Sequence, residues 1–157
     1  MGNNPYRGTE VPVAKSKESI EKLLRGHGVS ATRFTSLPAM AVLEFVTQKQ
    51  VNGRPLNIPY RFEFTPELSV DSSTRAINAA ERQVWRVVYW WLKGKFEAID
   101  FGLIEQETEF LPYMLIQGDS GQVNTVSKML GERLAGRLGA DSDPFGGLKV
   151  LPAPEGK

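Results

Sequence analysis

Apolar residues recur with the period of an α-helix across residues 77–101, the longest periodic stretch of the chain. At about 100° per residue these positions form a broad arc, which is typical of a helix buried on more than one side. The members of the arc are Ile77, Ala80, Val84, Trp85, Val87, Val88, Tyr89, Trp91, Leu92, Phe96 and Ile99. We therefore predict one long helix, capped at its start by Ser72, Ser73 or Thr74.

Two alternating segments, residues 41–51 and 54–64, flank the dipeptide Asn52-Gly53. Asn-Gly in this setting is the strongest short-range signal for a two-residue hairpin turn. Pairing around the turn brings the less polar residues of both strands onto one face. The predicted pairs on that face are Leu43 with Phe62, Phe45 with Tyr60 and Thr47 with Ile58, while Glu44 pairs with Arg61 on the other face.

The second strand of this hairpin contains Pro55 and Pro59. Proline cannot donate a backbone hydrogen bond and is tolerated mainly in edge strands. We therefore predict that the outer side of this strand is unpaired. A further strand at residues 31–36 could complete a small antiparallel sheet on the other side of the hairpin.

A short helix is predicted before the sheet. Ser16 stands where an N-cap would begin a helix through Ile20, Leu23 and Leu24. Gly26 or Gly28 would end it, since glycine is common just past a helix C-terminus. Residues 11–13, ahead of this helix, could form a short strand.

Beyond the long helix, the acidic residues 105–109 lead into a second helical segment, at the end where the helix dipole favours carboxylates. This segment runs through Phe110, Tyr113, Met114 and Ile116, with Pro112 near its first turn, and residues 117–121 then form a loop. A last amphipathic helix presents Val126, Met129, Leu130, Leu134 and Leu138.

These elements predict an α+β fold, in which a small antiparallel sheet packs against one long helix and shorter C-terminal helices. Residues 1–140 make a single domain, and residues 141–157 form a tail rich in proline and glycine.

Composition excludes several classes of protein. The chain has 157 residues, of which 41% are hydrophobic and 24% charged, as in an ordinary soluble domain. Without cysteine it has no disulfide, no catalytic thiolate and no thiolate zinc site. We find no apolar run of membrane-spanning length and no apolar core of a secretion signal near Met1, so a cytoplasmic location is expected. The net charge of +1 does not mark a general nucleic-acid binder.

Three features could carry chemistry, and each has a simpler interpretation. His27, the only histidine, lies between two glycines at a predicted helix end, where catalysis or metal binding would need partners. Ser120 lies in a Gly-Asp-Ser-Gly run but lacks the strand and turn of a nucleophile elbow. Glu105, Glu107 and Glu109 match no calcium loop and suit a helix start. We predict no catalytic residue, no metal, no cofactor and no enzymatic activity.

A binding surface is the positive prediction. Arg82, Arg86 and Lys93 lie along one flank of the long helix, with Trp90 at the centre and outside the apolar arc. Cations that hold phosphates, interleaved with rings on which bases stack, are what single-strand recognition requires. Two other interpretations stay open: Trp90 could be covered by another part of the chain, or it could anchor a protein interface. Glu97 lies on the same face, and its negative charge argues against a surface that only binds phosphates.

Lys95 differs from these residues because it lies inside the apolar arc. A lysine ammonium there needs a partner or an open cleft. A carboxylate from the sheet, or a bound anion, would suit it.

Several motifs resemble a family of small uncharacterised proteins encoded in bacterial, phage and prophage genomes. The resemblance spans most of the chain and is strongest at Glu-Arg-Gln-x-Trp-Arg (81–86) and Lys-x-Lys-x-Glu-Ala (93–98); the others are residues 11–24, 109–113 and 151–154. Trp85, Arg86, Lys93 and Lys95 match the family, whereas its members carry aliphatic residues at Tyr89 and Trp90. The resemblance implies a mobile-element setting and no catalytic residue.

Together, these features predict a non-enzymatic protein that binds nucleic acid through Arg82, Arg86, Trp90, Lys93 and Lys95. The predicted ligand is single-stranded DNA during phage replication or recombination. The alternative is an accessory protein that modulates a host or phage enzyme through the Trp90 face. A homo-oligomer could join such surfaces into a continuous groove.

Overall fold

The computed structural model describes residues 4–37, 39–66, 68, 72–118 and 120–135. Within them the helices and strands are α1 (Val13–Gly26), β1 (Val29–Leu37), β2 (Met40–Val51), β3 (Arg54–Phe64), α2 (Thr74–Asp100), α3 (Gln106–Phe110), the 3-10 turn η1 (Leu111–Tyr113), β4 (Leu115–Gln117), β5 (Val123–Thr125) and α4 (Val126–Ala135). The first three strands form one antiparallel sheet, and β4 pairs with β5. The α+β prediction is confirmed.

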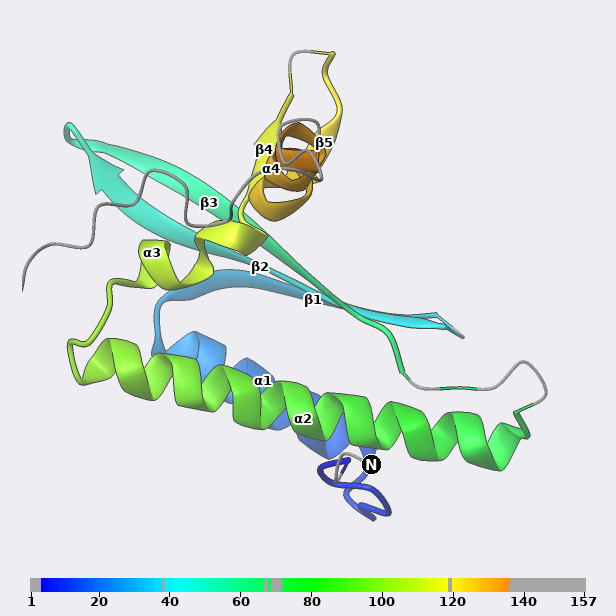
Figure 1. Ribbon diagram of the computed structural model, residues 1–157. Helices are drawn as coiled ribbons and strands as arrows, with labels where there is room; N and C mark the ends of the chain where they lie inside the picture. Colours follow the sequence, from blue (N-terminus) through cyan, green and yellow to red (C-terminus); the bar gives the residue numbers. More distant parts are fainter. Residues whose placement is uncertain (1–3, 38, 67, 69–71, 119, 136–157) are drawn as a thin grey trace, which may run out of the picture.

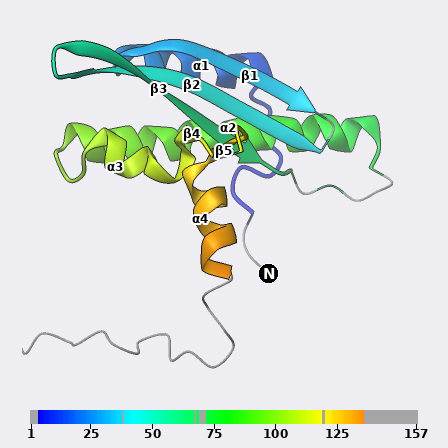
Figure 2. The same cartoon turned by 90° about the horizontal axis from the view of Figure 1, so that it is seen from above.

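The two long helices cover one face of the sheet (Figure 1). α1 and α2 lie side by side and run in the same direction, as both views show (Figures 1 and 2). The β4–β5 hairpin and α4 stand on the β3 side of the sheet, and α4 extends away from it (Figure 2). Among the described residues no helix has the length and apolar character that crossing a bilayer requires.

The predicted hairpin and its register are confirmed. Asn52 and Gly53 both have positive φ, 51° and 76°, as a two-residue turn that matches the strand twist requires. β2 pairs with β3 from Val51 opposite Arg54 outward, so the predicted partners meet. The predicted third strand is β1, on the other side of β2.

The outer edge of β3 differs in part from the prediction. β3 is an edge strand, as its prolines indicate, but Tyr60 forms an isolated antiparallel bridge with Met114. Proline removes its own N–H and leaves carbonyl groups and neighbouring residues able to bond. The edge of β3 therefore receives the chain at the start of the β4–β5 hairpin.

The core lies between the sheet and the helices. α2 contributes a fully buried line, Trp85, Val88, Leu92 and Phe96, at the three- and four-residue spacing of one helix face. The sheet supplies Leu43, Phe45, Tyr60 and Phe62, α1 supplies Ile20 and Leu24, and α3 supplies Phe110. Ser73 caps α2 by accepting a hydrogen bond from the Ala76 N–H at 3.3 Å, one of the three predicted caps.

Two predictions about α1 are wrong. The helix begins at Val13 and not near Ser16, and no strand forms at residues 11–13. The Pro12 carbonyl accepts the first backbone hydrogen bonds, from Lys15 and Ser16. Ser16 is buried four residues before Ile20, on the core face of the helix, and so does not act as a cap. The end of α1 at Gly26 agrees with the prediction.

The predicted helix after residue 105 is much shorter than expected. α3 ends at Phe110, a 3-10 turn follows, and Ile116 belongs to β4. Pro112 has no N–H to continue the helix and its ring clashes with the preceding turn. The partner strand β5 was not predicted. The last helix begins at Val126 as expected, while Leu138 and the predicted tail at 141–157 lie outside the described residues.

Opposite the helices, Glu44 joins all three strands of the sheet. Its carboxylate accepts hydrogen bonds from Arg33 of β1 and Arg61 of β3, the latter through Nε at 2.9 Å. The predicted Glu44–Arg61 pair is thus confirmed, with Arg33 as a second partner. The hydrogen bond from Arg33, against an opposing effect of burial and with help from Arg61, lowers the pKa of Glu44.

We predict that Glu44→Gln lowers the free energy of unfolding by about 1–2 kcal/mol at neutral pH. Because the pKa of Glu44 is lower in the folded state than in the unfolded chain, the folded state binds fewer protons in acid than the unfolded chain does. The contribution of Glu44 is therefore complete above the pKa of an unfolded glutamate, about 4.3, and is lost as pH falls through the folded pKa. Urea unfolding at several pH values measures it. The control is Glu63→Gln, which replaces an exposed acid on β3. If Glu44→Gln lowered the free energy of unfolding as much in acid as at neutral pH, the assignment would be wrong.

Candidate nucleic-acid interface

The surface predicted from the sequence lies on α2, on the side away from the buried line. Arg82, Arg86, Trp90 and Lys93 follow one another at three- and four-residue steps, which place them along one flank of the helix. Trp90 is 38% exposed, so neither the sheet nor the described part of α4 covers it. Among the described residues Trp90 is therefore not part of the core, whereas the tail, which could also have covered it, lies outside those residues.

Cations flank the exposed ring of Trp90. The Arg86 guanidinium carbon lies 5.2 Å from the ring centroid, and the Lys93 ammonium lies 4.9 Å from it. Arg86 also lies 5.3 Å from the ring of Tyr89, which meets Trp90 edge to face. Because Arg86 precedes Trp90 by one turn and Lys93 follows it by one turn, the helix itself positions both charges. We name Arg86, Tyr89, Trp90 and Lys93 the basic–aromatic surface.

Arg82 is less available than these residues. Its Nε donates a hydrogen bond to the Thr9 carbonyl at 3.3 Å, and the neighbouring Gln83 side chain donates to the Pro5 carbonyl at 2.8 Å. Residues 4–12 therefore lie along the first turns of α2. They place Arg82 at the margin of the surface.

Lys95 lies on the opposite side of α2. Its ammonium pairs with the Glu109 carboxylate and stands 4.7 Å from the ring centroid of Trp91. The two paired side chains are only 21% and 19% exposed. The partner that the sequence required thus comes from α3 and not from the sheet, and the structure does not bring Lys95 together with Trp90.

The acids after the long helix are engaged with lysines. Glu107 pairs with Lys49 of β2 at 2.9 Å, and this hydrogen bond lowers the pKa of Glu107. Together with the Lys95–Glu109 pair, it fastens α3 to both the sheet and α2. Within the described part of the chain, no group of three His, Asp or Glu side chains could hold a metal ion.

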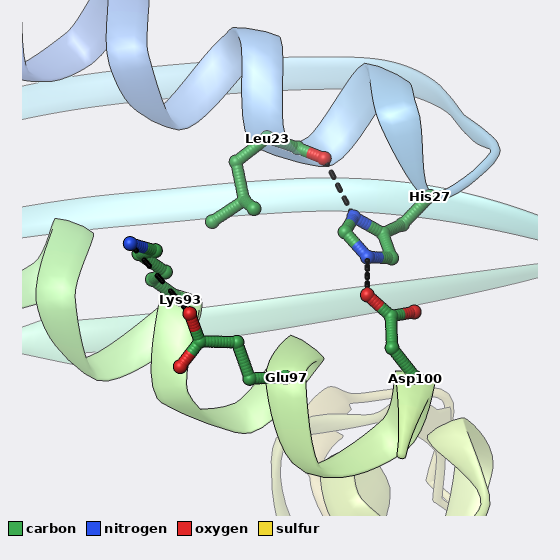
Figure 3. A network of polar contacts seen from close by, with 5 residues as sticks. All are labelled: Leu23, His27, Lys93, Glu97 and Asp100. Atoms are coloured by element: carbon green, nitrogen blue, oxygen red, sulfur yellow. Dashed lines mark hydrogen bonds and ion pairs between the residues drawn. The ribbon is translucent and has the colours of Figure 1, made fainter. Parts of the chain in front are cut away.

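His27 fastens the ends of the two long helices (Figure 3). Its Nδ1 lies 2.8 Å from the Leu23 carbonyl and its Nε2 lies 3.0 Å from the Asp100 carboxylate, while the ring stacks on Phe96 with centroids 4.1 Å apart. Both nitrogens face oxygen atoms, and both contacts become full hydrogen bonds only in the doubly protonated ring. The predicted helix-end position is confirmed, and the link to Asp100 joins α1 to α2.

Sequence reasoning missed two lysines of α1. A hollow of about 540 Å³ lies between α1 and α2, and its lining includes Lys15, Lys22 and Tyr89. The two lysines are seven residues apart, which puts them on one face of a helix. That spacing was visible in the sequence, but only the packing of α1 beside α2 shows that the lysines adjoin the basic–aromatic surface.

We predict that the Lys95–Glu109 pair stabilises the packing of α3 on α2. Lys95→Met or Glu109→Gln alone leaves a half-buried charge without its partner. The losses in the free energy of unfolding of the two single variants should therefore add up to more than the loss of the double variant. A double-mutant cycle from urea unfolding should give a coupling of about 1–2 kcal/mol. Additive losses would show that the two groups do not interact.

Comparisons of the chain with protein-family models, with curated proteins and with solved structures find no match in any of the three. The resemblance to the bacterial, phage and prophage family stays a prediction from sequence motifs. Function must therefore be inferred from the chemistry of this surface.

Proposed function

We propose that the protein binds single-stranded nucleic acid through the basic–aromatic surface of α2, without catalysing a reaction on it. The observation that carries this proposal is an exposed tryptophan with a guanidinium on the turn before it and an ammonium on the turn after it. Arginine and lysine provide contacts to phosphate, and an exposed indole provides a stacking platform for a base.

The strengths of these interactions favour an exchange of partners on binding. An exposed cation–π contact contributes about 0.5–1 kcal/mol, whereas stacking of a base on an aromatic ring contributes about 1–3 kcal/mol. A base that reaches Trp90 can therefore displace Arg86 or Lys93 from the ring, and the released cation can turn to a phosphate. Neither step requires a change in the backbone of α2.

Single strands suit this surface better than duplexes. The bases of a duplex are stacked inside the helix and cannot reach Trp90, so a duplex would use only the cations. A chain with a net charge of +1, and with Glu97 3.6 Å from Lys93, lacks the broad positive field that holds duplexes without sequence preference. The motif resemblance adds DNA in phage replication or recombination as the proposed setting, in the cytoplasm.

A protein partner is the second candidate. Phe101 and Leu103, just beyond the end of α2, are 80% and 72% exposed. Trp90, Arg86 and Phe101 are of residue types that are enriched at protein interfaces, and Leu103 adds exposed apolar area. Under this proposal the same face of α2 would contact a host or phage enzyme.

Fluorescence anisotropy with labelled single-stranded and duplex oligonucleotides, over a range of salt concentrations, tests the first proposal. We expect the single strand to bind more tightly, with an affinity that falls steeply as salt rises. Replacing Arg86 and Lys93 with Gln should reduce affinity about tenfold or more, since each removes a charged contact to phosphate. Trp90→Ala should make the binding free energy less favourable by about 1–3 kcal/mol and leave the salt dependence of the affinity nearly unchanged.

Each variant reports on a different part of the proposal. Loss of binding in the charge variant with no effect of Trp90→Ala would remove base stacking and keep phosphate contact. No binding of either oligonucleotide at low salt would reject nucleic acid as the ligand and leave the protein-interface proposal.

A further inference from the structure

The hollow between α1 and α2 continues directly from the basic–aromatic surface. Tyr89 lines the hollow, and its ring meets the ring of Trp90 edge to face with centroids 5.2 Å apart. The guanidinium of Arg86 lies over both rings. A ligand resting on Trp90 can therefore extend across Tyr89 toward α1 without leaving aromatic and cationic side chains.

The α1 side of the hollow supplies two further cations. Lys22 has no carboxylate within ion-pair distance among the described residues, and the same is true of Arg86. Lys15 pairs with Glu18 at 3.1 Å, but both side chains are mostly exposed, so little free energy opposes its release to another anion. Because seven residues span about 10 Å of helix, Lys15 and Lys22 present two separated charges opposite Tyr89.

At both ends of the hollow, other parts of the protein oppose a nucleic-acid strand that runs lengthwise between the helices. At one end, residues 4–12 lie along the start of α2 through the contacts of Arg82 and Gln83. At the other end stand the carboxylates of Glu97 and Asp100, the latter bonded to His27 (Figure 3). An anionic chain is repelled there. The open part is the middle. There the α1 side is lined by Lys15 and Lys22, with Glu18 paired to Lys15, and the α2 side is lined by Tyr89, whose ring lies under the Arg86 guanidinium.

We propose that a single strand crosses the α1–α2 pair at this middle part, with its phosphates held by Lys15 and Lys22 of α1 and by Arg86 and Lys93 of α2. This inference rests on the proposed function and adds the second helix, the path of the strand and the groove to it. The contact is short, because crossing two helices of about 10 Å diameter covers only about 20 Å. His27 and Asp100 keep the two rows of cations together by joining the helix ends.

The charge contribution of α1 can be tested with matched double variants. Lys15→Gln with Lys22→Gln removes two charges from the groove, while Arg54→Gln with Lys128→Gln removes two exposed charges from elsewhere in the fold. The groove variant should bind a labelled single-stranded oligonucleotide about tenfold or more weakly, and its salt slope should fall by about 1.4, which is about 0.7 for each phosphate that is no longer neutralised. The control should bind within about twofold of the unaltered protein, since its charges lie outside the path.

The path itself can be tested by cross-linking, because the chain contains no cysteine. Ser19→Cys places a thiol in the lining of the groove, and Ser127→Cys places one at an exposed position on α4. An oligonucleotide with a thiol-reactive group on an internal phosphate should cross-link to the first variant and only weakly to the second. Circular dichroism and oligonucleotide affinity check that both variants fold and bind.

The outcomes separate this inference from the function on which it rests. The groove would be rejected if the two double variants bound with equal affinity, or if the two cysteines cross-linked equally. If binding still depended on Arg86 and Lys93, the proposed function would stand. No binding by the unaltered protein would overturn both.

Discussion

Burial of one face of α2 against the sheet is the constraint on which the rest of the structure depends. Trp85, Val88, Leu92 and Phe96 enter a core made with Leu43, Phe45 and Phe62. Burying side chains of this size contributes about 1.5–3 kcal/mol each, more than any exposed ion pair in the fold. Because a helix is rigid about its axis, fixing this line inward fixes Arg86, Trp90 and Lys93 outward. The proposed binding surface is a geometric consequence of the core.

Charge pairs that join separate elements mark the structural residues, whereas Lys15 and Lys93, two of the proposed binding cations, pair only with acids on their own helices. Lys49 and Lys95 are paired with Glu107 and Glu109 and hold α3 in place, and Glu44 joins β1, β2 and β3 through two arginines. Arg86 and Lys22 have no such carboxylate partner among the described residues. Arg86 lies over the rings of Trp90 and Tyr89, and Lys22 lines the same hollow as Tyr89. A near-neutral chain can thus present a local cationic site, because its acids neutralise the cations that the fold needs.

The relation between α1 and α2 determines whether that site is a ridge or a groove. The helices run in the same direction, and His27 joins their ends through Asp100 while stacking on Phe96. This arrangement brings Lys15 and Lys22 beside Tyr89, more than sixty residues away in the chain. A lone α2 would offer one row of cations, whereas the pair offers two with a hollow between them.

The hairpin register, the class of fold and the long helix could be predicted from the sequence, because Asn52-Gly53 and the apolar periods are local signals. The direction in which Trp90 points followed from the same period.

Other features depended on the tertiary structure. Pro112 stopped a helix that the pattern continued, because the effect of a proline depends on the exact start of the helix. Lys95 was expected in the apolar arc and is found there, but its partner Glu109 could be identified only when α3 packed on α2. The sequence by itself determined which residues share a face of each element, since that depends only on backbone geometry. Which faces meet, and hence that Lys22 adjoins Tyr89, was decided by long-range packing of the core.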